Sequence, residues 1–368
     1  MDRRHRRRMA IVHPWVLRAR GAERVFFELA RTFPQADLFL LHHNPEALPP
    51  DLRGRLVATS FLDRRAVRAL PYRWLLPMLP LAAESLPLRD YDLVLSSSYG
   101  WAHGVVTGDS TRHISYMHSP PRHVWGEDPG MGNRLRPALN LVLHYGRMWD
   151  ERAASRVDEF IANSELTAQR IQKRYRRDAE VIHPPVDIER FRHVRPDPRG
   201  YLLAIGELVR YKRFDLAIEA ARRARRPLVI VGDGPERASL EALAGDAEVR
   251  FAGRVTDAQL ETLMGGASAL LHPGVEDFGI VMVEALAAGL PVIASAEGGA
   301  PEILGRGPGV LVRELDAEAY ADAIATLEHR HLDVCAARER AERFGIARFR
   351  AALCSLVGDS SEVELATR

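Results

Sequence analysis

Cysteine, net charge and long apolar runs are all scarce in this chain of 368 residues. Its two cysteines, Cys335 and Cys354, have no metal-ligand spacing, which indicates a reducing compartment and no structural disulfide. A net charge of +2 provides no bulk attraction to nucleic acid, so we expect no nucleic-acid partner. Because no uncharged apolar run is long enough for a signal peptide or a spanning helix, we expect a cytoplasmic protein.

Two segments leave a peripheral contact with the inner face of the membrane open. The basic start, residues 3–8, is typical either of a solvated tail or of a segment that lies on an anionic membrane. Residues 66–88 mix arginines with aromatic and aliphatic side chains, which suits a membrane surface or a lipid-linked acceptor. The same composition also suits a helix that packs on its own domain.

Apolar runs alternate with amphipathic patterns along almost the whole chain, which predicts parallel sheets covered by helices. In the first half, strands are predicted at residues 9–13, 37–41, 91–97, 113–118 and 159–163, with a helix at 22–32. In the second half, strands are predicted at 201–206, 228–232, 249–253, 269–272, 291–295 and 309–312. The helices expected there are 214–224, 235–244, 257–265, 279–288 and 317–327.

A proline-rich junction separates the two halves. Pro184 and Pro185, and later Pro196 and Pro198, remove backbone donors and favour extended chain, which indicates a linker. A chain of this length also exceeds one compact core. We therefore predict an α/β protein of two Rossmann-like domains facing a cleft, residues 1–185 and 186–345, with a C-terminal helix in 346–368 that packs back on the first domain. Ligands of such sheets bind at the carboxyl ends of the strands.

Two glutamates eight residues apart, Glu276 and Glu284, flank the point where an apolar strand is expected to turn into a helix. The free amides in the first turn of a helix attract a phosphorylated ligand. Acid pairs of this kind are usually solvated, but apolar side chains surround these two along the sequence. Because an unpaired carboxylate is costly to bury, a ligand hydroxyl or a cation is expected to satisfy each one.

Glycine-containing loops follow three further strands of the second half. Residues 206–213 bring Arg210, Lys212 and a third cation together, which suits a pyrophosphate as well as a basic helix start on the surface. Residues 232–236 begin with Gly232 and allow close approach of a backbone, in a ligand site or in a structural turn. Residues 298–302 open a short helix and are a candidate wall of the same pocket.

In their order and spacing these motifs resemble the retaining glycosyltransferases of family 4, which have the GT-B fold. The resemblance rests on Gly232-Asp233-Gly234-Pro235-Glu236, His272-Pro273, Glu276 with Glu284, Gly289-Leu290-Pro291-Val292-Ile293-Ala294 and Gly298-Gly299-Ala300-Pro301-Glu302. It is strongest over residues 200–305 and looser in the first half. Residues 115–125 and 211–220 resemble a mannosyltransferase-like branch, whose members commonly use GDP-mannose to build surface glycans.

The resemblance implies a role for each matching residue of the second half. Glu276 would contact hydroxyls of the donor sugar, Glu284 would bind the nucleotide ribose, and Lys212 would bind phosphate. Three backbone amides would face the sugar and the pyrophosphate, those of Phe278, Gly279 and Ile280.

Three other positions complete the implied site. Gly21 would let the backbone approach the diphosphate. His118 would touch the donor sugar and the acceptor side, although a lone histidine after a strand also suits a structural role. Glu207 departs from the family, because it stands where an arginine usually follows the strand glycine. Arg210 is then the candidate that supplies the missing charge.

Such an enzyme needs positioning and charge stabilisation more than protein acids. The resemblance implies a retaining, metal-independent hexosyltransferase that moves a sugar, best mannose from GDP-mannose, to a hydroxyl of a glycan, a lipid-linked glycan or another small acceptor. The departing phosphate oxygen would take the proton of that hydroxyl. The catalytic set would be His118, Glu276, Arg210 and Lys212. We expect no cofactor and no metal, because the Asp-x-Asp at residues 90–92 precedes a strand.

Other functions fit less well or share the same motifs. A UDP-sugar-dependent transferase is one alternative. A sugar-nucleotide 2-epimerase of the same fold would need acid and base groups at the sugar carbon, and no clear set of these stands out in the first half. A non-catalytic partner subunit would be expected to lose the phosphate and glutamate positions, which are present. A nicotinamide dehydrogenase is disfavoured because the first strand turn lacks the glycine fingerprint.

Overall fold

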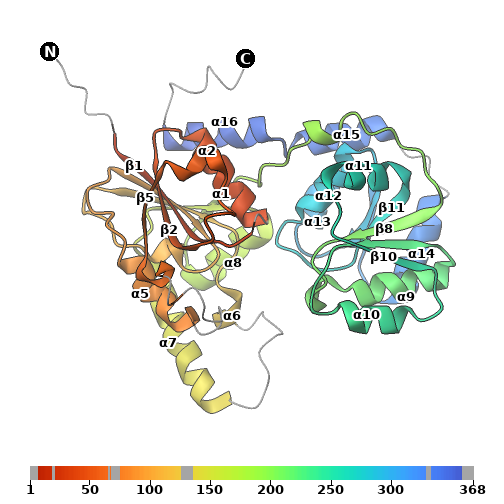
Figure 1. Cartoon of the computed structure of the whole chain (residues 1–368), viewed down its shortest axis with the longest axis horizontal. Helices are drawn as coiled ribbons and strands as arrows, with labels where there is room; N and C mark the ends of the chain where they lie inside the picture. The colour runs from red at the N-terminus through yellow and green to blue at the C-terminus, as the bar shows by residue number, and fades with distance from the viewer. Residues whose placement is uncertain are drawn as a thin grey trace. The chain divides into compact units, whose positions relative to one another are not determined.

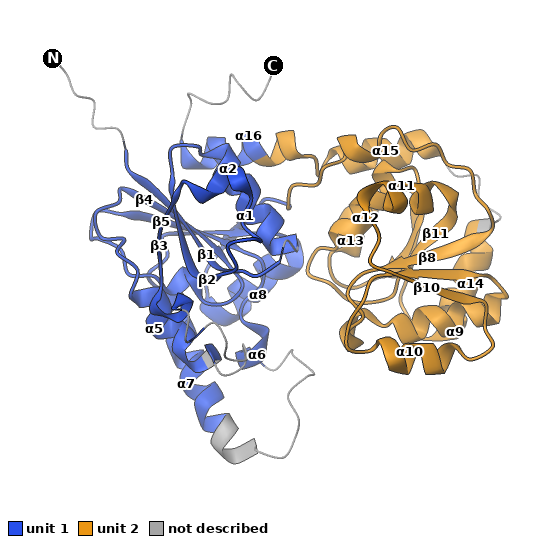
Figure 2. Ribbon diagram, in the orientation of Figure 1, with its two compact units in different colours: residues 1–183, 350–368 blue, residues 184–349 orange. Residues whose placement is uncertain are grey.

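The computed structural model describes residues 7–18, 21–64, 67, 75–125, 136–328 and 333–358. The chain forms two compact units (Figures 1 and 2). Unit 1 comprises Met1–His183 together with Arg350–Arg368, and unit 2 comprises Pro184–Phe349. Most of the basic start, and residues 66 and 68–74 of the arginine-rich segment, lie outside the described residues.

Seven parallel strands form the described sheet of unit 1, in the order β3-β2-β1-β4-β5-β6-β7. They are β1 (Met9–Val16), β2 (Asp37–His43), β3 (Leu56–Thr59), β4 (Leu93–Ser98), β5 (Arg112–Met117), β6 (Glu159–Ala162) and β7 (Ala179–Val181). The helices are α1 (Gly21–Thr32), α2 (Pro50–Arg53), α5 (Leu79–Glu84), α6 (Arg122–Trp125), α7 (Arg136–Ala154) and α8 (Glu165–Tyr175). Seven of the eight residues of β1 are buried, as expected for a parallel strand with both faces covered.

Six parallel strands form the sheet of the described part of unit 2, in the order β10-β9-β8-β11-β12-β13. They are β8 (Tyr201–Ile205), β9 (Leu228–Val231), β10 (Val249–Gly253), β11 (Ala267–His272), β12 (Val292–Ser295) and β13 (Gly309–Val312). The helices are α9 (Phe214–Ala224), α10 (Arg237–Ala244), α11 (Asp257–Gly266), α12 (Ile280–Ala287), α13 (Ala300–Leu304), α14 (Ala317–Glu328) and α15 (Val334–Glu342).

Successive side chains of the strands in unit 2 enter two separate apolar cores. Leu202 and Ala204 pack in the core that α9, α10 and α14 cover, whereas Leu203 between them packs in the core of α12 and α15. Figure 1 shows these two groups of helices on opposite faces of the sheet. Each unit is therefore a parallel sheet between helices, which confirms the predicted α/β class with two Rossmann-like sheets.

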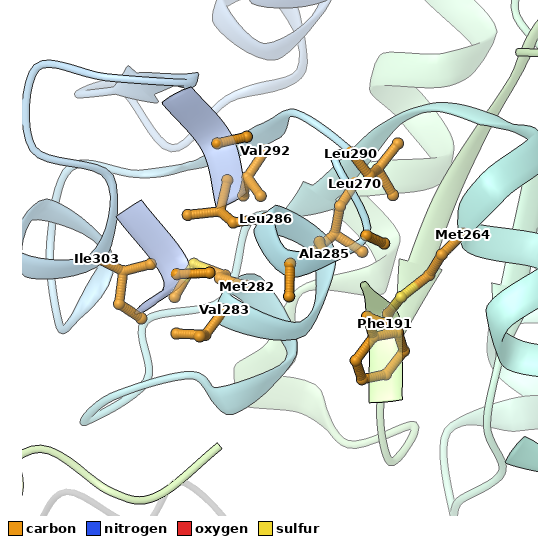
Figure 3. Close-up of a cluster of buried hydrophobic side chains, with 14 of the residues drawn as sticks. Phe191, Met264, Leu270, Met282, Val283, Ala285, Leu286, Leu290, Val292 and Ile303 are labelled. Carbon is orange, nitrogen blue, oxygen red and sulfur yellow. The ribbon is translucent and has the colours of Figure 1, made fainter. Parts of the chain in front are cut away.

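Helix α12 lies within one of these cores, which Figure 3 shows in close-up. Its Met282, Val283 and Leu286 are buried against neighbours that include Val292 of β12 and Ile303 of α13. The helix is apolar on nearly all sides because it fills the space between the sheet and the outer helices. This burial fixes the direction in which the start of α12 points.

Replacing Leu286 with alanine is expected to lower the free energy of unfolding by about 2–5 kcal/mol, because the surrounding side chains only partly fill the cavity. Leu286→Met nearly conserves the volume and should cost less than about 1.5 kcal/mol. Urea denaturation of both variants measures the difference. A Leu286→Ala variant as stable as the parent would contradict the close packing around α12.

The helix α16 (Ile346–Val357) begins in unit 2 and ends in unit 1. Nε of Arg350 donates to Oε1 of Glu28 in α1 at 2.6 Å. Arg112 of β5 donates to the carbonyl oxygens of Leu356 and Val357. A cation at the C-terminal end of a helix satisfies its free carbonyls and complements its dipole. These contacts confirm the expected packing of the C-terminal helix on the first domain.

Exposed apolar side chains occur on two helical segments of unit 1. Leu81 in α5 is 60% exposed, and the preceding Met78 is 43% exposed. Leu141, Tyr145 and Met148 share one face of α7 and are all more than half exposed. Within the described ranges, no helix combines the length and the apolar composition that a membrane span requires.

Candidate active site

Most of the predicted residues of unit 2 lie in loops that follow strands at their carboxyl ends, and the others lie in α12. Lys212 ends the 3-10 turn η6 (Arg210–Lys212) after β8, and Gly232 directly follows β9. Glu276 lies in the loop between β11 and α12, and Glu284 lies within α12. The remaining predicted positions span the end of that loop and the start of the helix, at Phe278, Gly279 and Ile280.

Glycines hold these loops in backbone contact with one another. A Cβ on Gly232, whose φ is +131°, would lie 1.8 Å from the carbonyl oxygen of Gly206. A Cβ on Gly298 would lie 2.4 Å from the carbonyl oxygen of Glu276, and one on Gly274 would lie 2.6 Å from Cα of Lys212. These approaches leave no room for a side chain, and they bring Lys212 and Glu276 together.

Alanine at Gly232 is expected to destabilise unit 2 by about 2–4 kcal/mol, because the new Cβ meets backbone at a positive φ. Gly200→Ala is the matched control, since its φ is +83° but no atom lies within 4 Å of the Cβ position. It should lose only roughly 1 kcal/mol from backbone strain. Thermal unfolding compares the two variants, and equal losses would contradict the close approach of the two loops.

Lys212 and Glu276 form the central ion pair of this site. Nζ of Lys212 lies 2.8 Å from Oε1 of Glu276, and Nε2 of His272 lies 3.4 Å from the same oxygen. The side chains of Lys212 and Glu276 are 15% and 20% exposed, so water screens the pair only weakly. The lysine side chain crosses Gly206, where a Cβ would lie 2.7 Å from Nζ.

The charges of the site follow from these contacts. Burial lowers the pKa of Lys212, but the nearby Glu276 raises it, and Tyr211 and Glu207 raise it further. The pKa is therefore above its ordinary value. Lys212 is therefore a cation at neutral pH. Burial also lowers the pKa of His272, a shift that Glu276 opposes and Lys212 reinforces, so the imidazole is neutral. A cation suits a phosphate oxygen and a carboxylate suits a hydroxyl, and the site offers one of each.

Helix α12 starts beside this pair. Its N-cap is Gly279 with φ +98°, and a Cβ there would lie 2.3 Å from Cε of Met282 and 3.5 Å from Nε2 of His272. No side chain caps the helix at Gly279. The amides of Gly279 and Ile280 lie at the start of the helix, where no helical carbonyl accepts a hydrogen bond from them. They can therefore bind an anion. Glu284 lies further along α12 and is only 9% exposed.

Arg210 and Glu207 differ from the central pair in their exposure. Arg210 is exposed at the start of η6, and its side chain makes no hydrogen bond or ion pair within the described residues. The structure therefore does not bring Arg210 against Glu276. Glu207 is half-buried and acts electrostatically on Lys212. In the described ranges, no three His, Cys, Asp or Glu side chains gather in a group that could hold a metal ion.

His118 and Gly21 lie in unit 1. Gly21 is the exposed first residue of α1. His118 follows β5, is 8% exposed, and has a pKa lowered to about 3 by burial. Its Nε2 lies 2.8 Å from Oγ of Ser97, which also lies 3.0 Å from Nδ1 of His13. The sequence prediction did not include Ser97 and His13, because their 84-residue separation leaves no local signal.

Two family models match the chain. The model described as Glycosyltransferase Family 4 matches residues 19–190, and the model described as Glycosyl transferases group 1 matches residues 185–347. The chain belongs to glycosyltransferase family 4. The two matches follow one another along the chain, and the family resemblance read from the sequence motifs is thereby confirmed.

The chain spans about half the length of the curated family members it matches. A GDP-mannose-dependent alpha-(1-6)-phosphatidylinositol monomannoside mannosyltransferase of Mycobacterium tuberculosis is 34% identical over 180 residues, which cover 40% of this chain and 46% of that protein. A D-inositol 3-phosphate glycosyltransferase of Mycolicibacterium paratuberculosis is 28% identical over 243 residues, which cover 59% of this chain and 54% of that protein.

Solved structures resemble almost the whole chain. Anabaena HepE in complex with UDP has a TM-score of 0.70 at 17% identity, over 95% of this chain and 99% of that one. WaaG, a glycosyltransferase involved in lipopolysaccharide biosynthesis, has a TM-score of 0.67 at 19% identity, over 96% of this chain and 100% of that one. At these identities the likeness shows the fold, and it is the predicted GT-B fold.

Proposed function

We propose that this family 4 member is a retaining glycosyltransferase that moves a sugar from a nucleotide-sugar donor to an acceptor hydroxyl. The observation that carries this proposal is the Lys212–Glu276 ion pair of 2.8 Å beside the start of α12. A cation, a carboxylate and free helix amides at the carboxyl ends of parallel strands suit a sugar joined to a diphosphate. Residues 186–345 would bind the donor and residues 1–185 the acceptor.

Each group of the donor site has a part in this proposal. Lys212 and the amides of Phe278, Gly279 and Ile280 bind the diphosphate and stabilise the charge that develops on it as it leaves. The carboxylate of Glu276 exchanges Lys212 for hydroxyls of the sugar, and Glu284 binds the ribose. Gly206 leaves room for the side chain of Lys212, and Gly232 lets the loops after β8 and β9 meet.

Mannose from GDP-mannose is the donor that we propose first. The Mycobacterium tuberculosis relative is described as GDP-mannose-dependent, and residues 115–125 and 211–220 resemble a mannosyltransferase-like branch. A UDP-sugar is the second candidate, because the structurally similar HepE was solved in complex with UDP. Exposed Arg210 remains a candidate contact of the diphosphate, while Glu207 contributes through Lys212.

The acceptor that we propose is a hydroxyl of a glycan or a lipid-linked glycan at a membrane surface. The relative named above acts, by its description, on a phosphatidylinositol monomannoside. Met78 and Leu81, in the segment that the sequence marks for a membrane or lipid contact, are exposed apolar side chains. We propose a cytoplasmic protein with peripheral membrane contact and no cofactor or metal.

The test combines donor binding with turnover. Thermal unfolding should shift upward with GDP and less with UDP, since a ligand that binds the folded form stabilises it. GDP-mannose should then release GDP only when an acceptor such as a phosphatidylinositol mannoside is present, with or without EDTA. Retention of the α-configuration in the product is read by NMR. Release of an epimerised sugar without acceptor would instead support the 2-epimerase and overturn the transferase.

A further inference from the structure

One serine joins two buried histidines in unit 1. Oγ of Ser97 lies 3.0 Å from Nδ1 of His13 and 2.8 Å from Nε2 of His118. The side chains come from three adjacent strands of the sheet: His13 lies in β1, Ser97 lies near the carboxyl end of β4, and His118 directly follows β5. His13 is fully buried, Ser97 is fully buried, and His118 keeps 8% of its surface.

The number of protons on Ser97 and the two histidines limits how they can hydrogen-bond to one another. A serine hydroxyl has one proton, and a neutral imidazole has one N–H and one lone pair. Both histidines are neutral, because burial lowers the pKa of each well below its ordinary value. Ser97 makes no other side-chain hydrogen bond within the described residues. Its proton therefore serves one histidine, and the other histidine donates to its oxygen.

The other ring nitrogen of His13 decides which histidine donates its hydrogen bond to Ser97 and which one accepts. Nε2 of His13 is buried and has no hydrogen-bond partner within the described ranges, and its ring stacks on Phe26 with centroids 4.7 Å apart. If Ser97 donated to His13, this Nε2 would carry a buried proton without an acceptor, which is unfavourable. Buried N–H groups without an acceptor are rarer than acceptors without a donor. The favoured order is His13 donating to Ser97, and Ser97 donating to His118.

We propose that Ser97 and His13 are positioning residues that hold His118 in the Nδ1–H tautomer. Nε2 of His118 accepts from Ser97, so the proton lies on Nδ1. Nε2 of His13 is a buried nitrogen without a hydrogen-bond partner, and Nδ1 of His118 is not. His118 thus presents a neutral N–H that binds an acceptor oxygen of a ligand and takes up no proton.

The surroundings of His118 agree with a neutral donor. The rings of Tyr99 and Tyr116 pack against it with centroids at 5.8 and 5.2 Å. The hydroxyl of Tyr99 donates a hydrogen bond to the carboxylate of Glu23 at 3.1 Å. The ligand oxygen is a sugar hydroxyl or a phosphate oxygen. This identity rests on the proposed function, whereas the tautomer does not.

The tautomer can be observed without any turnover. In protein labelled with ¹⁵N-histidine, long-range ¹H–¹⁵N spectra at neutral pH should show His118 with a protonated Nδ1 and a bare Nε2. His118→Gln assigns the signals by their loss. The same pattern should appear for His13, whose Nδ1 donates to Ser97. A His118 protonated on Nε2 in the wild-type protein would overturn the proposal.

Two variants at Ser97 have nearly the same shape and differ in the hydroxyl. Ser97→Thr should keep the His118 tautomer and the activity. Ser97→Val should move the proton of His118 to Nε2 and lower kcat about 10-fold or more with a nearly unchanged KM for the donor, as expected when the partner that orients a functional histidine is lost. An unchanged tautomer in folded Ser97→Val would overturn the proposal; if that variant does not fold, the wild-type spectrum still decides. An Nδ1–H tautomer in a protein without transferase activity would support the inference and refute the proposed function.

Discussion

Replacing Lys212 with methionine is expected to lower kcat about 10²- to 10³-fold, the loss typical when one group that stabilises developing negative charge is removed. Methionine keeps most of the apolar stem that crosses Gly206 but removes the cation 2.8 Å from Glu276. Of the two groups named above at Oε1 of Glu276, the neutral His272 at 3.4 Å then remains. The measurement is acceptor-dependent release of GDP from GDP-mannose, with circular dichroism to establish that the variant is folded.

Lys173 provides a matched control, because the chain contains two lysines, Lys173 and Lys212. Lys173 is exposed on α8, so Lys173→Met should leave kcat unchanged. The pair also permits a test without turnover. Saturating GDP should protect Lys212, and not Lys173, from acetylation by an amine-specific reagent, as read by mass spectrometry. Full activity of Lys212→Met, or a Lys212 that GDP does not protect, would refute the phosphate site.

Unit 1 is expected to lose much of its stability when the pH falls from 7 to about 5. Burial lowers the pKa of His13 well below its ordinary value and lowers those of His113 and His118 to about 3. In the unfolded chain each titrates near 6.5, so below that pH the unfolded chain binds protons that the folded chain does not. Each histidine then costs about 1.4 kcal/mol per pH unit down to its folded pKa. Three of them remove roughly 6 kcal/mol by pH 5, a large part of a typical domain's stability.

Tryptophan fluorescence measures this transition in unit 1 alone, because all five tryptophans of the chain, Trp15, Trp74, Trp101, Trp125 and Trp149, lie before residue 184. His113→Gln keeps a polar partner for Ser96, which lies 2.9 Å from Nε2 of His113. It should flatten the dependence of stability on pH by about one third. His144→Gln, at an exposed position of α7, should not change it. A fluorescence signal that stays native down to pH 4 would contradict the buried neutral histidines.

The sequence predicts the strands of unit 2 closely, and this includes the half-exposed edge strand β10. The predicted strand at 249–253 has the bounds of β10, and the one at 228–232 differs from β9 by one residue. The strands β3 and β7 were not predicted, because they are only four and three residues long and their sequences, LVAT and AEV, form no extended apolar run. Helix α7 was also not predicted. Leu141, Tyr145 and Met148 occupy its exposed face, so the usual contrast between polar and apolar faces is missing.

The sequence predicts the members of the candidate site better than their contacts. Lys212 and Glu276 each follow from their place after a strand, but their ion pair depends on glycines that let separate loops meet. The same limit applies to Ser97. Neighbouring side chains of a strand point to opposite faces, and only the folded sheet shows that His13 and His118 flank this serine. Contacts between residues far apart in the chain leave no periodic pattern to read.

Unit 1 is made of two separate stretches of chain, whereas unit 2 is one continuous stretch. The carbonyl oxygens that Arg112 binds belong to Leu356 and Val357, so they leave the ribosome after the whole of unit 2. Arg112 can pair with Glu159 before that point, but its contacts with α16, and the contact of Glu28 with Arg350, form only after unit 2 has been made. The unit that is translated second is therefore the first that can complete its fold. Unit 1, which is translated first, is completed last, when α16 packs on it.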